Sequence, residues 1–341
     1  MSSMSSSLWL PIAAFAVSLG VVRLVERYAR VVGLVDVPNV RSSHVAARPR
    51  GGGIGIVLGV VLPLTAAAFV HPIPRTMWAL ISAPSFVAAV GLWDDIRRIG
   101  PWPRLLAQAV AAVWIVIGVG AIDRLPLPPP LDVPLGVLGP ALTLVWLVGV
   151  TNFFNFMDGL DGLAGGQAIV TLSALAWAMW PEEAAGLALV TAAASAAFLL
   201  RNWSPARVFL GDVGSSFLGL MLATLPLAGS ADVRPRLTLL VAVSLALFLL
   251  DPVATLFARA RRGAALGVAH REHAYQQFVA PGASHATVVA RLLVTAAALS
   301  LVAVAGYQQP SLAWLGVIAA TIAFGVEWWL AARRRRADSA P

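Results

Sequence analysis

The sequence predicts an all-α, polytopic integral membrane protein with about 11 transmembrane helices (10 or 11). Of its 341 residues, 59% are hydrophobic and only 12% are charged, half the charged fraction of ordinary globular domains. The mean hydropathy is +0.82, which excludes a soluble enzyme because such a chain could not cover its surface with polar groups. Apolar runs long enough to cross a bilayer as helices recur along the whole chain.

The apolar runs are separated by charged residues, proline or glycine, and each run predicts one helix. The first run follows Ser and Met rather than a basic segment, so we expect a retained helix instead of a signal peptide. A tight turn at 181–183 and a proline-rich external loop at 125–134 each join two neighbouring runs. We expect a single membrane domain over 1–341, without internal repeats. The expected spans are 8–25, 54–71, 77–93, 105–122, 135–152, 163–180, 184–200, 213–230, 237–258, 287–306 and 311–331.

All 24 basic residues are arginine, and most of them gather on one side of the predicted membrane. That side holds 20 arginines, the C-terminus and loops 26–53, 94–104, 153–162, 201–212 and 259–286. The other side holds only Arg75, Arg124, Arg234 and Arg236. The positive-inside rule makes the first side cytoplasmic, with the N-terminus outside. We therefore interpret the net charge of +8 as basic loops at a membrane surface, and we expect no nucleic-acid partner.

Carboxylates also gather on the predicted cytoplasmic face, because all five of its loops carry acidic residues there. These residues are Asp36, Asp94, Asp95, Asp158, Asp161, Asp212 and Glu272. A single acid of this kind is as well explained by a solvated loop charge. Ionisable groups near the bilayer are costly and tend to mark function, so the whole set predicts a site. Without cysteine or lysine, a phosphate clamp there has to use Arg, His or backbone N–H groups.

The first loop combines basic side chains with a glycine run at the start of a predicted helix. Arg41, His44 and Arg50 precede or adjoin the glycines at 51–53. Glycines let backbone N–H groups approach an anion, and a helix N-terminus favours negative charge. The loop is therefore a candidate anion site; the alternative is a flexible turn.

Asp94 and Asp95 are adjacent at the end of a predicted helix, and arginines follow them. Adjacent carboxylates can approach a divalent cation, or they can raise one another's pKa so that one serves as a base. The alternative is a solvated helix end whose acids pair with Arg97 and Arg98.

A segment rich in asparagine and aspartate follows the fifth predicted helix. Asn152, Asn155 and Asp158 stand three residues apart, so a helical turn stacks them on one face, and Asp161 follows in a repeated Asp-Gly-Leu. Hard oxygen ligands of this kind suit Mg²⁺, which keeps waters and substrate phosphates in its shell. Asp212, flanked by glycines at the start of a later helix, either completes this oxygen set or caps its helix.

The longest cytoplasmic loop carries His270, Arg271 and His273. Two histidines around an arginine can hydrogen-bond a diphosphate. A zinc site would need more nitrogen or sulfur ligands than this loop offers. Asp251 lies within a predicted span next to Pro252, and we leave open whether it is a buried arginine partner or a neighbour of a helix kink.

Together these loops resemble the polyprenyl-phosphate N-acetylhexosamine-1-phosphate transferases, which are of the glycosyltransferase family 4 type. Members start bacterial cell-wall, O-antigen and enterobacterial common-antigen glycolipids. The matching segments are 36–53, 94–108, 152–165, 209–215 and 270–276, in the family's order. The run Asn-x-x-Asn-x-x-Asp-Gly-Leu-Asp-Gly-Leu-Ala, which begins at Asn152, is the most specific. The run Gly-Asp-x-Gly-Ser, which begins at Gly211, supports it.

The resemblance implies the reaction and its location. A UDP-N-acetylhexosamine would give its sugar 1-phosphate to undecaprenyl phosphate and release UMP, at the cytoplasmic face of the bacterial inner membrane. This would initiate a cell-surface polysaccharide such as the O-antigen of lipopolysaccharide. The bilayer is the other implied partner, and a homodimer is left open. The identity of the sugar is left open as well.

The resemblance also implies roles for individual residues. It implies Mg²⁺, with Mn²⁺ as an alternative, held by Asp212 and Asn155. The implied catalytic residues are Asp94, Asp95, Asp158, Asp161, His270, Arg271 and His273. The implied substrate-binding residues are Arg41, His44, Arg50, Gly52, Arg104, Asn152, Gly211 and Ser215. Which acid acts as the base is left open, although Asp94 is one candidate. Arg104 and Ser42 stand where relatives often carry lysine, which changes the geometry of a phosphate contact.

Three other functions compete with this interpretation. A phospho-N-acetylmuramoyl-pentapeptide transferase is disfavoured, because the chain lacks the consecutive histidines and the Phe-Glu ending of the last loop of those enzymes. An ion-coupled transporter would place acids near mid-bilayer on broken helices, where only Asp251 qualifies. A CDP-alcohol phosphotransferase would carry further paired aspartates on one helix downstream, whereas here Asp161 is followed by Gly-Leu-Ala-Gly.

Overall fold

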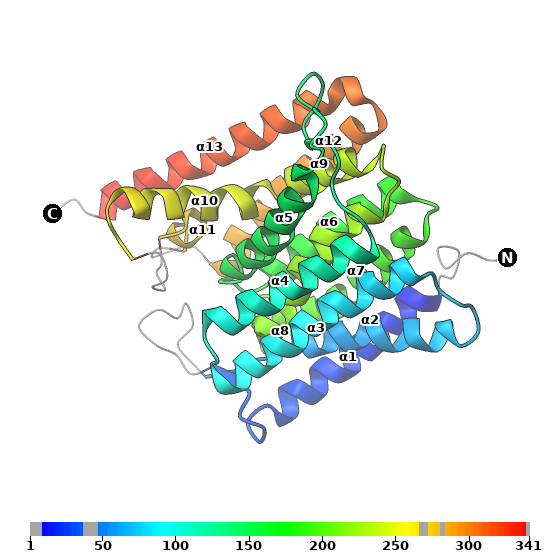
Figure 1. The fold of residues 1–341 in the computed structure, drawn as a ribbon. Helices are drawn as coiled ribbons and strands as arrows, with labels where there is room; N and C mark the ends of the chain where they lie inside the picture. The colour runs from blue at the N-terminus through cyan, green and yellow to red at the C-terminus, as the bar shows by residue number, and fades with distance from the viewer. Residues whose placement is uncertain (1–8, 37–46, 266–271, 280–283, 339–341) are drawn as a thin grey trace.

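The structure is a computed structural model that describes residues 9–36, 47–265, 272–279 and 284–338, and these residues are predominantly α-helical (Figure 1). The predicted all-α class is confirmed. Two short strands, β1 (Val35–Asp36) and β2 (Arg48–Pro49), pair antiparallel, with Val35 opposite Pro49. The helices are α1 (Trp9–Tyr28), α2 (Gly53–Ala68), α3 (Arg75–Arg97), α4 (Pro101–Gly118), α5 (Leu138–Phe156), α6 (Leu163–Met179), α7 (Glu183–Asn202), α8 (Gly211–Thr224), α9 (Arg234–Ser244), α10 (Ala246–Arg261), α11 (Ala274–Gln277), α12 (His285–Gln308) and α13 (Ala313–Asp338), with 3₁₀ turns η2 (Leu225–Ala228) and η3 (Pro310–Leu312).

Every expected apolar run is helical, but the run 237–258 is broken. It forms α9 and α10, which are bent by 71° relative to one another. The Ser244 carbonyl at the break accepts a hydrogen bond from Gln167 Nε2 (2.9 Å), so a side chain of α6 satisfies it. Among the described residues, eight helices are long and apolar enough to cross a bilayer, or nine when the bent pair counts as one span. Helices α2 and α6 are shorter, with 16 and 17 residues, so a total of about 11 spans stays a prediction.

Helix α8 forms the centre of the bundle, and all of its residues are buried. Helices α3 and α5 pack along it, and glycines bring the backbones close together. A Cβ atom on Gly91 of α3 would lie 2.5 Å from the Asp212 carbonyl oxygen, and one on Gly219 of α8 would lie 2.9 Å from Thr151 Cα. Small residues commonly allow such close helix packing in membrane proteins. The N-terminus of α8 is therefore held tightly against the end of α3.

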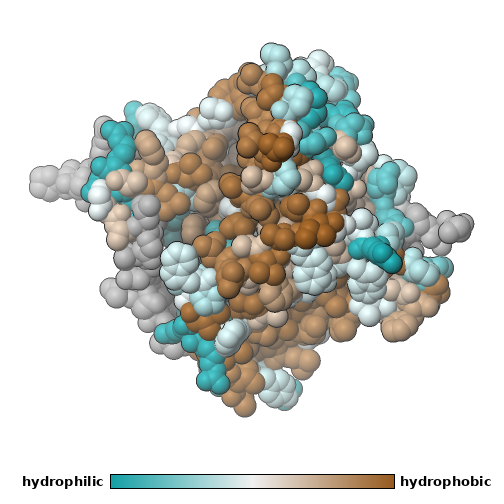
Figure 2. Space-filling model, in the orientation of Figure 1, coloured by the Kyte–Doolittle hydropathy of each residue, from teal (hydrophilic) through white to brown (hydrophobic). Residues whose placement is uncertain are grey.

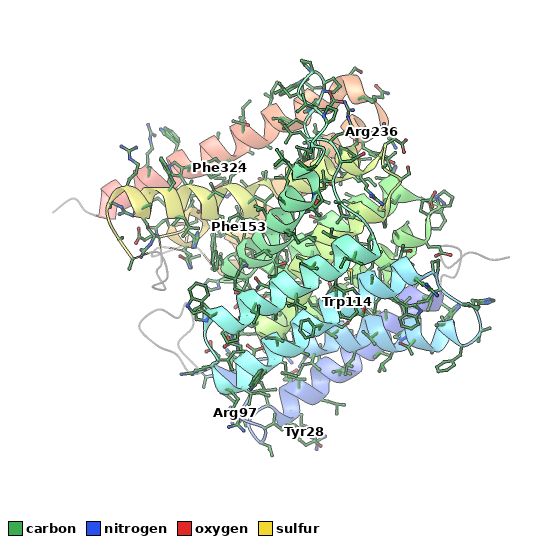
Figure 3. The ribbon with its side chains drawn as sticks, viewed as in Figure 1. Tyr28, Arg97, Trp114, Phe153, Arg236 and Phe324 are labelled. Carbon is green, nitrogen blue, oxygen red and sulfur yellow. The ribbon has the colours of Figure 1, made fainter. Side chains whose placement is uncertain are left out.

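Helices α10, α11 and α13 form an arm that extends from the bundle beside α5 (Figure 1). Apolar side chains cover much of the middle of the visible face, and hydrophilic residues gather towards its margins (Figure 2). Figure 3 places Arg97 and Tyr28 at one end of the molecule and Arg236 near the loop before α5, far from them. Arg97 and Arg236 belong to the larger and the smaller arginine groups of the sequence, so these two members lie in different regions of the fold.

Candidate active site

Five segments of the chain converge at one end of the bundle. Helices α3 and α5 end there, α4 and α8 begin there, and the chain passes from β2 into α2 there. The αL conformation of Arg98 (φ 52°) and the positive φ of Gly100 (87°) turn the chain sharply from α3 into α4. The residues that this convergence brings together are Arg50, Asp94, Asp95, Arg104, Asn155 and Asp212.

Asp95 fastens the N-terminus of α8 to the end of α3. Its Oδ1 accepts a hydrogen bond from Asp212 N (2.9 Å), and its Oδ2 accepts one from Val213 N (3.1 Å). Arg50 Nε lies 2.8 Å from Asp95 Oδ1, and the Asp95 side chain has no exposed surface. A carboxylate at a helix N-terminus is favoured by the helix dipole and by unpaired N–H groups. Asp95, expected to be catalytic, therefore positions its neighbour Asp212.

Asp212 lies at the centre of the cluster. Its Oδ1 accepts hydrogen bonds from Arg50 (3.1 Å) and from Asn155 Nδ2 (3.2 Å), and its Oδ2 accepts one from Arg104. These donors come from the chain before α2, from α5 and from α4. The structure thus brings together the two residues expected to bind the metal, Asp212 and Asn155, with two arginines expected to bind substrate.

Asp94 faces the same cluster from the last turn of α3. Its Oδ2 lies 3.2 Å from Arg104 NH1, and its Oδ1 accepts a hydrogen bond from Gly100 N (3.2 Å). Arg104 NH1 also contacts Asp212 Oδ2, so this guanidinium joins the two carboxylates. Adjacent in sequence, Asp94 and Asp95 have different environments because successive helical residues point in different directions. The ion pairs of the described residues join them to Arg104 and Arg50, and not to Arg97 and Arg98 as in the alternative interpretation of a solvated helix end.

The cluster contains more carboxyl groups than guanidinium groups. Burial alone lowers the pKa of the Arg50 guanidinium, but Asp95, Asp212 and other nearby carboxylates raise it above its usual value. Burial, with the Asp212 charge as the next cause, raises the pKa of Asp158 well above the usual carboxyl value. Four aspartates, at 94, 95, 158 and 212, therefore face two arginines. This imbalance favours a further cation.

The side chains of Asp212 and Asn155 offer oxygen atoms of the kind that Mg²⁺ binds. Within the described ranges, no group of three or more acidic or histidine side chains is arranged as a complete metal site. Mg²⁺ is usually bound by one or two carboxylates together with waters and substrate phosphates, rather than by a full protein cage. A carboxylate on Asp212 and an amide oxygen on Asn155 agree with that mode.

Asp161 lies outside the contacts of the Asp212 cluster. Its Oδ2 accepts a hydrogen bond from Ala206 N (3.0 Å) and lies 3.8 Å from His285 Nδ1. The neighbouring Gly162 N–H donates to Asn202 Oδ1 (2.9 Å). Asp161, expected to be catalytic, therefore holds the loop between α7 and α8 that delivers Asp212. The His285 side chain is largely covered at this junction.

Four residues expected to bind substrate make close contacts within the protein. Asn152 Nδ2 donates to Gln108 Oε1 and so links α5 to α4. Gly52 N donates to Phe209 O (2.8 Å), so this N–H is not available to an anion as the glycine run had suggested. Gly211 has φ 76°, and a Cβ there would lie 2.6 Å from Asp95 Oδ2. Ser215 Oγ donates to Gly211 O (3.1 Å) within the first turn of α8.

The structure describes only part of the histidine-containing loop. Arg41, His44, His270 and Arg271 lie outside the described residues. His273 is buried, 3.4 Å from Asp251 Oδ1 through its Nδ1, and its ring stacks on Tyr275. Sequence reasoning left the role of Asp251 open, and the structure shows that Asp251 pairs with the backbone of this loop rather than with an arginine.

Residues 77–230 match the glycosyl transferase family 4 domain, and this stretch contains Asp94, Asp95, Asn155, Asp158 and Asp212. Residues 77–230 are thus similar to glycosyl transferase family 4. The resemblance drawn from the loops is thereby confirmed at the level of the family. It also agrees with the all-α architecture, in which the matched segment runs from α3 to α8.

Three proteins similar to this chain give the match more detail. A Bacillus subtilis protein named as a probable undecaprenyl-phosphate N-acetylglucosaminyl 1-phosphate transferase is 31% identical over 64% of the chain and 63% of its own length. The undecaprenyl-phosphate alpha-N-acetylglucosaminyl 1-phosphate transferase of Salmonella typhi is 29% identical over 88% of the chain and 84% of its own length. The decaprenyl-phosphate N-acetylglucosaminephosphotransferase of Mycobacterium tuberculosis is 28% identical over 78% of the chain and 74% of its own length. The chain thus spans less than two thirds of the Bacillus protein.

Proposed function

We propose that this protein transfers N-acetylhexosamine 1-phosphate from a UDP-N-acetylhexosamine to undecaprenyl phosphate. The products are an undecaprenyl-diphosphate sugar and UMP, and the reaction starts the synthesis of a cell-surface polysaccharide. The observation that carries the proposal is the Asp94–Asp95–Asp212 cluster with Arg50, Arg104 and Asn155 at one end of an apolar helix bundle. A reaction between two phosphate-bearing substrates at a membrane surface needs such a mixture of fixed charges.

The cluster divides its tasks among its residues. An oxygen of the lipid phosphate attacks the sugar-linked phosphorus of the UDP-sugar, and the bond to the UMP oxygen breaks. Arg50 and Arg104 bring fixed positive charge to the phosphates, and a bound Mg²⁺ would neutralise further charge on the diphosphate. Asp94 is the better candidate for accepting a proton from the lipid phosphate, because 13% of its side chain is exposed, whereas the side chain of Asp95 has no exposed surface.

Mg²⁺, or Mn²⁺ in its place, is proposed at Asp212 and Asn155. The excess of carboxylates over guanidinium groups in the cluster supports a cation there. The arginine-rich loops support a cytoplasmic position for the cluster in the bacterial inner membrane, by the positive-inside rule. A homodimer is a separate prediction that a measurement of mass in detergent can test.

UDP-N-acetylglucosamine is the first donor to test. The relatives from Bacillus, Salmonella and Mycobacterium are all named for the transfer of N-acetylglucosamine phosphate to undecaprenyl or decaprenyl phosphate. A phospho-N-acetylmuramoyl-pentapeptide-transferase of Lactiplantibacillus plantarum also matches, at 31% identity over 58% of its length. The sequence of the histidine-containing loop, with no consecutive histidines at 270–276, favours the first group.

UMP release by the purified protein in detergent tests the proposal. The assay contains undecaprenyl phosphate, Mg²⁺ and one UDP-sugar at a time, with UDP-N-acetylglucosamine, UDP-N-acetylgalactosamine and the UDP-muramoyl pentapeptide as donors. We expect release that requires the lipid, the metal and one N-acetylhexosamine donor, and that EDTA stops. Release with the pentapeptide donor alone would contradict the choice of substrate. No release with any donor, from monodisperse protein that binds no UDP-sugar, would contradict the reaction.

A further inference from the structure

Asp251 is a buried carboxylate in α10 that binds the backbone of a distant segment. Its Oδ1 accepts a hydrogen bond from Ala274 N (3.0 Å), and its Oδ2 accepts one from Tyr275 N (3.2 Å). Thr255 Oγ1, one turn further along α10, donates to Oδ1 (3.0 Å). Only 4% of the residue surface is exposed. Asp251 therefore caps the first turn of α11 from another helix.

Asp251 and α11 depend on one another. Helix α11 has only four residues, far fewer than a helix needs to persist by its own hydrogen bonds. The described ends of α11 include no side-chain cap of its own. A buried carboxylate in turn is costly unless donors compensate it, and hydrogen bonds to a charged acceptor are among the strong ones. Loss of the Asp251 charge should therefore loosen α11 more than any other helix.

Tyr275 connects α11 to the candidate active site. Its hydroxyl donates a hydrogen bond to the Phe156 carbonyl (3.1 Å), at the end of α5 between Asn155 and Asp158. A Cβ atom at Gly159 would collide with this hydroxyl, so the turn and the tyrosine are closely fitted. The burial of Tyr275, with the charge of Asp251 as the next cause, raises the pKa of its phenol above the usual value. The hydroxyl therefore stays a neutral donor.

His273 is carried by the same small unit. Its ring stacks on Tyr275, with ring centroids 5.8 Å apart, and lies 6.5 Å from the ring of Phe156. On the other side of His273, Glu272 pairs with Arg259 and Arg262 near the end of α10, which lowers the pKa of Glu272. Glu272, at the start of the segment 272–279, is thus anchored independently of Asp251. Loss of Asp251 should free α11 and the ring of His273 without detaching Glu272.

We propose that Asp251 is a positioning residue that docks α11 against the turn between Asn155 and Asp158, and that Tyr275 completes this docking. This rests on the proposed function and on the catalytic role that the resemblance implies for His273. Asp251 acts through the segment that it holds, because its hydrogen bonds go to α11 and to Thr255 rather than to the Asp212 cluster. The chain from Asp251 through Tyr275 to Phe156 spans α10, α11 and α5, which are far apart in the sequence.

The test compares Asp251→Asn and Tyr275→Phe with the wild-type protein in full-length, detergent-solubilised form. Asp132→Asn serves as the matched control, because it removes an acid paired with Arg124 in the loop before α5, away from α11. Hydrogen exchange of the amides at 272–279 is measured without substrate, so it reports on α11 even if the reaction is misassigned. Steady-state UMP release is then measured at varied UDP-N-acetylglucosamine with saturating lipid and Mg²⁺.

We expect faster exchange at Ala274 and Tyr275 in Asp251→Asn, with α8 amides unchanged. We expect kcat to fall about 10- to 100-fold, the effect typical of losing a residue that orients a functional group, and KM for the donor to change less than threefold. Tyr275→Phe should show a smaller fall in kcat, and Asp132→Asn none. Unchanged exchange at α11 would overturn the docking role. A lower yield of folded protein with wild-type kcat and KM would show a structural role alone.

Discussion

Gly91 is the position where one methyl group tests the link between helix packing and the site. Its Cβ in a Gly91→Ala variant would lie 2.5 Å from Asp212 O, 2.7 Å from Asp212 C and 2.9 Å from Val213 N. These atoms are backbone, so no side chain can rotate away. To reach the shortest ordinary contact of 3.4 Å, α3 and the start of α8 have to separate by about 0.9 Å.

That separation would lengthen the hydrogen bonds of Asp95, which is one turn further along α3. Asp95 Oδ1 to Asp212 N would lengthen from 2.9 Å, and Asp95 Oδ2 to Val213 N from 3.1 Å, each to beyond hydrogen-bonding distance if the helices move as rigid units. We expect overpacking to cost about 1–3 kcal/mol of stability. Misplacement of a catalytic group by about 1 Å can lower a rate by about 100-fold.

Thermal unfolding in detergent and UMP release check this prediction, with Gly149→Ala as the matched control. Gly149 lies within α5, and a Cβ there would meet nothing within 4 Å. Because alanine favours a helix over glycine by up to about 1 kcal/mol, the control should keep or raise its Tm and keep its activity. Gly91→Ala should lower both the Tm and the rate of UMP release. A Gly91→Ala variant that behaves like the control would refute the argument that α3 and α8 are in backbone contact at the site.

Two further predictions concern carboxylates of the cluster. Asp212→Asn keeps the size of the side chain but removes the charge that Arg50 and Arg104 pair with. Mg²⁺-dependent UMP release should therefore fall by about 100- to 1,000-fold. Full activity of the variant in an Mg²⁺ titration would exclude Asp212 as a metal ligand. Asp158 has a raised pKa in the folded state, so its ionised form costs stability increasingly as pH rises above the usual carboxyl pKa. Asp158→Asn should therefore raise the Tm at pH 7.5, by less as the pH is lowered, while UMP release falls. Unfolding curves of both proteins across this pH range provide the check, and a lower Tm for the variant at pH 7.5 would contradict the sign.

The asparagine and aspartate run shows how far local spacing leads. The spacing of Asn152 and Asn155 predicts one helical face, and both residues lie in the last two turns of α5. Their partners nevertheless differ, because α5 contacts α8 at one residue and α4 at the other. Asn155 donates to Asp212, whereas Asn152 donates to Gln108. Spacing within a helix predicts a shared direction, but it carries no information about which helix lies opposite each turn.

Asp94, Asp95 and Asp251 show the same limit for charged groups. The sequence predicts two adjacent acids at a helix end, and it cannot tell that one fastens α8 while the other stays beside Arg104. In the sequence, Asp251 is a lone acid beside a proline. In the structure, it binds backbone N–H groups more than 20 residues away. Backbone partners leave no mark in a residue pattern.

The amino-acid sequence by itself determined the class of fold, the positions of the helical runs, the uneven distribution of arginine and the family. These properties depend on apolar length, on charge and on local spacing, which are all read along the chain. Only the tertiary structure decided the break between α9 and α10, the occupied N–H of Gly52, the different roles of Asp94 and Asp95, and the hold of Asp251 on α11. Each of these results depends on which backbones meet across the bundle, and that is set by packing between segments distant in the sequence.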